Sequence, residues 1–176
     1  ADVDGLTTLN LSATNASLTL GAMGTDATAN NAELLSTITT TATGTGVVLT
    51  TGALFADSTV DSTSDLAMTI NTTTNVGAQT VLGAIDNTYG SITGTFVSHS
   101  SDDTDVGNLT AVDLTLTVSG GGDTDFQDLI ASGTVAVTAS GSGNLTIDDA
   151  NIDGTSASLS VDASAMSGTV SAVATN

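Results

Sequence analysis

Short runs of apolar residues spaced two apart recur along the chain, and this period limits the fold more than any other feature. Successive side chains of a strand point to opposite faces, so the alternation predicts strands with one buried face. Gly, Asn, Asp and Ser separate the runs, as is typical of turns. The sequence therefore predicts an all-β protein. The runs lie at residues 9–11, 18–20, 68–70, 114–118, 135–137, 145–147 and 159–161.

An internal repeat suggests how these strands are arranged. Residues 144–154 (NLTIDDANIDG) match residues 158–168 (SLSVDASAMSG). Strand centres near Val135, Leu145, Leu159 and Val170 alternate between short and long spacings, so the full period spans two strands. Such periods are typical of solenoids, whose coils bury apolar side chains by stacking. We expect one β-rich domain over residues 1–176, a parallel β-solenoid or β-helix with rungs of about 24 residues. An antiparallel β-sandwich is the alternative.

A fainter repeat and two helix-like segments complete the pattern. The motifs LTLGAM (18–23), LTTGAL (49–54) and VLGAI (81–85) echo one another. Residues 26–39 (DATANNAELLSTIT) carry Ala, Glu and paired Leu after Asn residues that can cap a helix, which predicts one short helix. Residues 125–132 are a second helix candidate.

The charge of the chain is one-sided. It has 19 acidic residues, no Lys and no Arg, giving a formal net charge of -19. Such a chain cannot neutralise phosphates, which excludes nucleic acid as a partner, and anionic lipids would repel it. No apolar run approaches the roughly 20 residues of a membrane span. The carboxylates have no Lys or Arg partner, so we expect cations from the surroundings to neutralise them.

Calcium is the cation that this sequence favours. All but one of the acidic residues are Asp, a short, hard oxygen ligand that suits turns. Residues 120–125 (GGGDTD) partly resemble the G-G-x-G-x-D calcium nonapeptide of RTX β-rolls, with Asp123 where the third Gly stands. The alternative is that these Asp residues only form turns and keep the surface soluble. The candidate ligand clusters are Asp57, Asp61 and Asp65; Asp102, Asp103 and Asp105; Asp123, Asp125 and Asp128; and Asp148, Asp149 and Asp153.

Residues for catalysis are scarce, so we expect no enzyme. His99 is the single imidazole and there is no Cys, which leaves neither a second His for zinc nor a thiol nucleophile. The pairs Asp102-Asp103 and Asp148-Asp149 could serve a glycosidase, but the aromatic platforms of sugar sites are missing. Thr pairs within 37–45, 72–74, 93–95 and 115–117 could form an ice-binding array, yet their irregular spacing favours ordinary strand propensity.

Residues 5–11, 145–150 and 159–166 resemble the Thr-, Ala-, Gly- and Asp-rich repeats of RTX-type bacterial surface-layer (S-layer) proteins and giant secreted adhesins. The resemblance implies type I secretion, calcium-dependent folding and calcium-driven assembly at the cell surface. It leads us to expect an extracellular structural subunit of a layer or filament, with itself and a cell-surface glycan as candidate partners. An adhesin or ice-binding module is the alternative.

Both ends of the sequence lie within the strand pattern. Residues 5–11 and 168–173 alternate like interior runs, and no capping segment is recognisable. Solenoids need their terminal strand edges covered. We therefore expect either further chain or a neighbouring subunit at each end.

Overall fold

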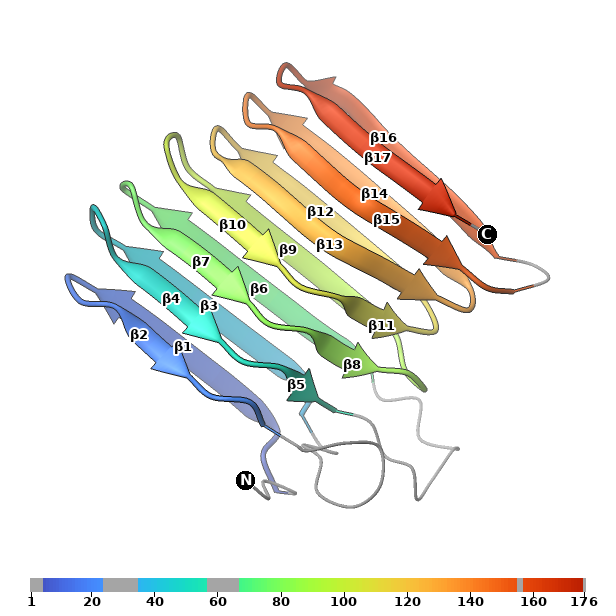
Figure 1. The fold of residues 1–176 in the computed structure, drawn as a ribbon, viewed down its shortest axis with the longest axis horizontal. Helices are drawn as coiled ribbons and strands as arrows, with labels where there is room; N and C mark the ends of the chain where they lie inside the picture. Colours follow the sequence, from blue (N-terminus) through green and yellow to red (C-terminus); the bar gives the residue numbers. More distant parts are fainter. Residues whose placement is uncertain (1–4, 24–34, 57–66, 155–156, 176) are drawn as a thin grey trace.

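The protein is a parallel β-solenoid in which two sheets face each other across a core (Figure 1). The computed structural model describes residues 5–23, 35–56, 67–154 and 157–175. Every strand pairing recorded for these residues is parallel, which confirms the solenoid and not the antiparallel sandwich.

One strand from each coil builds a seven-stranded sheet. Its strands, in spatial order, are β1 (Thr8–Thr14), β3 (Thr37–Thr43), β6 (Met68–Asn75), β9 (Ile92–Ser98), β12 (Leu114–Gly120), β14 (Thr134–Gly141) and β16 (Ser158–Met166). The facing sheet contains β2 (Leu18–Leu20), β4 (Val48–Thr51), β5 (Leu54–Phe55), β7 (Gln79–Leu82), β8 (Ile85–Asn87), β10 (Asp103–Val106), β11 (Leu109–Ala111), β13 (Asp123–Ala131), β15 (Leu145–Ile152) and β17 (Val170–Thr175). We call it the split sheet, because several coils cross it as two short strands.

The strand register confirms the predicted period. Val135 pairs with Leu159, and Leu145 pairs with Val170, so each strand centre lies directly beside the equivalent centre of the next coil. The shorter repeat, between residues 144–154 and 158–168, has a different origin. It relates β15 to β16, which lie in opposite sheets, so it marks half a coil.

The fainter repeat also corresponds to stacked coils. Leu18 pairs with Leu49, and Leu54 pairs with Ile85. The Gly-Ala step inside the motif is where β4 gives way to β5 and β7 gives way to β8. A Cβ atom built on Gly83 would lie 2.5 Å from the carbonyl carbon of Gly52 in the neighbouring coil. These glycines therefore let successive coils approach closely at the bend.

Replacing Gly83 by Ala is expected to lower the free energy of unfolding by about 1–3 kcal/mol, as overpacking does. The clash is with backbone, which cannot rotate away. Gly21→Ala is the matched control, since Gly21 occupies the same motif position in the first coil and its Cβ would meet nothing within 4 Å. Urea unfolding followed by circular dichroism measures both variants; equal effects would contradict the close-approach explanation.

Of the two predicted helices, one is wrong and the other lies mostly outside the described residues. Residues 125–132 form no helix; most of them belong to β13, because Phe126 and Leu129 both face the core and the neighbouring strands supply their backbone partners. The predicted helix at 26–39 lies mostly outside the described residues, and its last residues, 37–39, belong to β3. Across the described ranges, no helix has the length and apolar character needed to cross a membrane.

The core combines aliphatic layers with one aromatic pair and a buried hydroxyl seam. The rings of Phe96 and Phe126 meet edge to face at a centroid distance of 5.1 Å, and both are fully buried. At the turn between the two sheets, the Thr74 hydroxyl lies 2.9 Å from that of Thr104, which lies 2.6 Å from the Ser98 hydroxyl. These buried hydroxyls partner one another within a coil and between adjacent coils, which removes the cost of burying them unpaired.

Candidate metal centre

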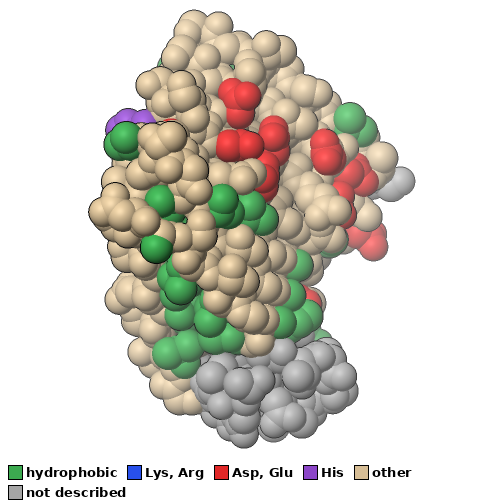
Figure 2. Space-filling model, turned by 60° about the vertical axis from the view of Figure 1, so that its left-hand side comes forward, with side chains coloured by type: hydrophobic (Ala, Val, Ile, Leu, Met, Phe, Trp, Pro, Cys, Tyr) green, Lys and Arg blue, Asp and Glu red, His purple; other side chains and the backbone are tan. Residues whose placement is uncertain are grey.

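Three carboxylates converge on the outer face of the split sheet. Asp103 and Asp105 are two apart on β10, so both point outward while Thr104 between them points into the core. Asp105 pairs in register with Asp125 of β13, the next strand of the sheet. One carboxylate oxygen from each of Asp103, Asp105 and Asp125 lies within 4.8 Å of the others. Figure 2 shows acidic side chains gathered on this part of the surface.

Burial and like charges act on this group in a way that a bound cation would offset. Burial, and then the charges of Asp105, Asp125 and Asp123, raise the pKa of Asp103, while a hydrogen bond from the Thr104 backbone works against them. The Oδ1 atom of Asp103 is buried and has no hydrogen-bond partner among the described residues. Asp105 accepts a hydrogen bond of 2.9 Å from Nε2 of Gln79, which orients its carboxylate. A cation would relieve both the repulsion and the unpartnered oxygen.

The spacing of the carboxylate oxygens is compatible with calcium. Ca²⁺ binds oxygens at about 2.3–2.6 Å, so two ligands on opposite sides of one ion stand about 5 Å apart. Oxygens within 4.8 Å of one another can therefore share an ion. The three carboxylates would supply part of the six to eight oxygens that Ca²⁺ takes. The group borders a groove of about 400 Å³, into which Asp148 also faces.

The second and third predicted clusters contribute only in part. Asp103, Asp105 and Asp125 come together, but Asp102 lies in the preceding turn, where it is buried and accepts a hydrogen bond from the Gly77 amide. Asp123 is exposed and accepts a hydrogen bond of 2.9 Å from the Asn144 amide. These two Asp residues mainly hold the turns of adjacent coils together.

The remaining predicted ligands do not join this group. Asp128 pairs in register with Asp149, which accepts a hydrogen bond of 2.9 Å from the Thr175 hydroxyl. Asp148 lies only at the groove, and Asp153 is exposed beyond the end of β15. The predicted cluster of Asp57, Asp61 and Asp65 lies outside the described residues.

The residues that the sequence offered for catalysis lie as follows in the described part of the chain. His99 is exposed in the turn before β10, and its carbonyl accepts the Asp102 amide. Asp102 and Asp103 do not form an acid pair, because one is buried in the turn and the other starts the outward-facing series. That the protein is not an enzyme stays a prediction.

The first and last coils each present an open end among the described strands. Strand β16 has a neighbour on one side, β14, and its apolar side chains Leu159 and Val161 are only partly buried. In β17 every described side chain is exposed, with 38% of Val170 and 51% of Val173 accessible. At the opposite end, β1 has β3 as its one neighbour within the described part of the sheet.

Comparison with protein-family models, with curated proteins and with solved structures gives no match for this chain.

Proposed function

We propose that this chain is a structural subunit of an extracellular, S-layer-like layer or filament that assembles by end-to-end stacking of coils and is stabilised by calcium. The observation that carries the proposal is the complementarity of the two open ends. It is supported by the resemblance to surface-layer repeats and by the acidic composition, which requires cations from outside the chain.

The two ends offer opposite edges of the same parallel sheet. Strands β1 and β16 are the outermost described strands of the seven-stranded sheet and run in the same direction. The free edge of β16 can therefore hydrogen-bond to the free edge of β1 from a second copy, as β14 does to β16 within one chain. Such a head-to-tail contact forms a ring only if the rotation between successive copies closes a circle. Otherwise it builds filaments.

Side-chain size matches across this contact as well. The core-facing positions are Leu9, Leu11 and Ala13 in β1, and Leu159, Val161 and Ala163 in β16. Both strands thus place two large aliphatic residues before a small one. Within the chain, β14 shows the same order with Val135, Val137 and Ala139. Val135 and Val137 pair in register with Leu159 and Val161, and the register shifts beyond Thr138. A β1 strand from a second copy would meet β16 with the same apolar order.

Calcium would bind on the outer face of the split sheet and not at the open ends of the solenoid. Binding at Asp103, Asp105 and Asp125 would neutralise like charges on adjacent coils and favour the stacked state over the unfolded chain. In calcium-poor surroundings the chain would be less stable, because the repulsion would be uncompensated. This dependence fits an exported protein that completes folding outside the cell.

Assembly can be tested with a one-sided block. Val161→Asp places a charge among the apolar residues of the last coil, so growth at that end should stop while the β1 end remains able to add to wild type. Sedimentation velocity and electron microscopy in calcium should show filaments or larger assemblies for wild type and none for Val161→Asp alone. Mixed with wild type, the variant should shorten the filaments, which a misfolded chain would not do.

Val76→Asp is the matched control, since Val76 is 63% exposed in the turn after β6, which is an interior strand of the seven-stranded sheet. Its positive φ of 62° is a conformation that Asp tolerates. We expect it to assemble like wild type. Wild-type protein that stays monomeric with calcium at high concentration, or Val161→Asp that assembles normally, would refute coil stacking.

A further inference from the structure

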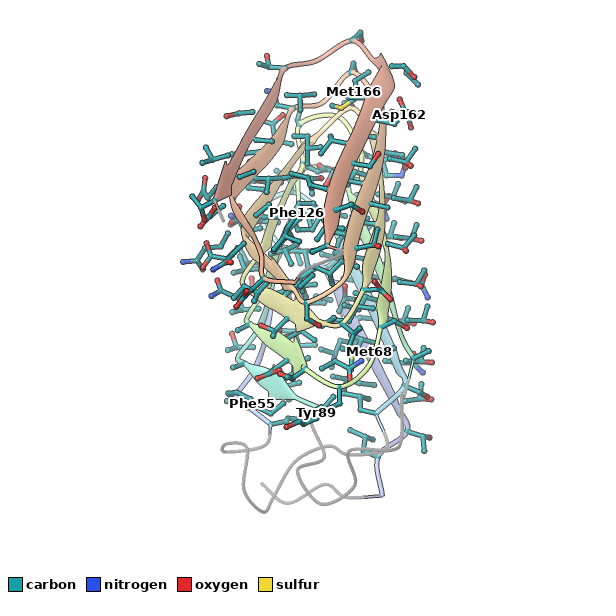
Figure 3. All side chains as sticks on the ribbon, turned by 90° about the vertical axis from the view of Figure 1, so that its right-hand side faces the viewer. Phe55, Met68, Tyr89, Phe126, Asp162 and Met166 are labelled. Carbon is teal, nitrogen blue, oxygen red and sulfur yellow. The ribbon has the colours of Figure 1, made fainter. Side chains whose placement is uncertain are left out.

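The outer face of the seven-stranded sheet carries almost no charge, although the whole chain carries 19 acidic residues. From β1 to β14 the strands of this sheet contain no Asp, Glu or His. The one carboxylate on its strands is Asp162 in β16, labelled at the outer side of the sheet in Figure 3. The other acidic residues that the structure describes lie on the split sheet and in the turns and connections, so the two faces differ in chemistry.

Threonine hydroxyls, with two asparagine amides among them, line this uncharged face in straight rows across the strands. The first row contains Thr8, Thr37, Thr69, Thr93 and Thr115, each paired in register with the next. The second row lies two positions further along each strand and contains Asn10, Thr39, Asn71, Thr95, Thr117 and Thr138. Figure 3 shows the corresponding column of outward side chains along the sheet.

The rows are straight although their members are unevenly spaced in the sequence. The chain that joins Thr8 to Thr37 is longer than the chain that joins Thr93 to Thr115, yet both pairs are in register. The additional length lies in the connections outside the strands of this sheet, so the strands keep their register. The uneven spacing along the sequence argues against an ordered array. At the surface, however, the strand register makes the spacing even. The predicted pair Thr72 and Thr74 is an exception, because both face the core.

We propose that this face binds ice. Neighbouring strands lie about 4.8 Å apart and alternate residues on a strand about 6.6 Å apart, so the hydroxyls form a nearly rectangular grid. Threonine is stiff at χ1, so each hydroxyl and methyl group holds a defined position. A regular grid of this kind can order water at spacings close to those between oxygen atoms in the ice lattice. The methyl groups between the hydroxyls restrict water to those positions.

Other occupants fit this surface less well. An ionic ligand has no charge to bind on strands β1 to β14 of this sheet. A sugar chain usually stacks on aromatic rings, and Phe96, the aromatic residue of these strands, faces the core. The extended, uncharged face is suited to a crystalline solid rather than to a single small molecule. The inference is independent of coil stacking, since a monomer displays the same face.

Ice affinity and thermal hysteresis of the purified protein test this proposal. Wild type is expected to partition into a slowly growing ice front and to lower the freezing point below the melting point. Thr117→Tyr places a bulky ring in the second row, near the middle of the sheet, and should abolish most of both activities. Thr19→Tyr is the matched control, because Thr19 is also exposed on an outer face but lies on the split sheet. It should leave both activities at the wild-type level.

Circular dichroism and melting temperature must be the same for both variants, and Thr117→Val provides a milder second change that keeps shape and removes one hydroxyl. Absence of hysteresis in wild type, or equal loss in both Tyr variants, would overturn the proposal. So would binding of wild type to insoluble cellulose or chitin without binding to ice.

Discussion

Phe126→Ala is expected to lower the free energy of unfolding by about 3–5 kcal/mol, the usual cost of truncating a fully buried aromatic residue. Phe126 is 0% exposed and lies between the two sheets in a central coil (Figure 3). The change also removes its edge-to-face contact with Phe96. Since domains are typically stable by only about 5–15 kcal/mol, the variant should lose a large part of its total stability. Urea denaturation followed by far-ultraviolet circular dichroism measures the loss.

The position of Phe126 along the solenoid adds to this effect. Each coil is stabilised chiefly by its neighbours, so a cavity in a central coil weakens the stacking on both sides. Phe55→Ala is the comparison, because Phe55 is only half-buried in the short strand β5. We expect a clearly smaller loss there. If Phe126→Ala cost less than Phe55→Ala, the layered core described above would be wrong.

Calcium is expected to raise the melting temperature of wild type by roughly 5–10 °C relative to chelator. At a calcium concentration of about 100 times the dissociation constant, binding to the folded state alone adds about 2.7 kcal/mol. For a chain of this size, each kcal/mol corresponds to roughly 2–4 °C. Differential scanning calorimetry with calcium and with EGTA gives the difference directly. An unchanged melting temperature would remove calcium from the proposed function.

Asp103→Asn tests the site, because its effect on the melting temperature should change sign when calcium is added. With EGTA the variant should melt above wild type, because it removes a partly buried charge beside three other Asp residues. This higher melting temperature of the variant should disappear at low pH. The raised pKa means that folded Asp103 takes up its proton before the unfolded residue does, so the ionisation penalty disappears once the pH falls below the unfolded value.

With calcium the order should reverse, because the variant lacks one ligand and loses most of the gain. Asp153→Asn is the control. It removes the same charge from an exposed position outside the group, so it should keep the full calcium response. If both variants lost the response equally, calcium would be acting on total charge and not at Asp103, Asp105 and Asp125.

The class of fold and its period follow from the amino-acid pattern alone. Alternation in runs such as 135–137 and 145–147 reflects one buried face, which is a local property of a strand. The period followed from the order of strand centres and agrees with the register of Val135 on Leu159. The absence of Lys and Arg likewise needs no structure to imply external cations.

Predictions from local residue preference were wrong where contacts between stacked coils outweighed that preference. The stretch 125–132 has helix-compatible spacing of Phe126, Leu129 and Ile130, but it forms β13 because strands on both sides offer backbone partners. Thr72 and Thr74 were expected at the surface, yet they lie inside, where Thr74 shares hydrogen bonds with Thr80 of the same coil and Thr104 of the next. Neither outcome follows from one segment alone.

Which residues share a surface depends on how the coils stack, and the pattern along the chain does not reveal it. Asp105 and Asp125 are well separated in the sequence and become neighbours because β10 and β13 pair in register. Thr93 and Thr115 align in the same way, whatever the length of the connections between them. In a parallel solenoid, side chains meet across coils at a spacing set by backbone hydrogen bonds, and sequence distance within a loop carries no information about that register.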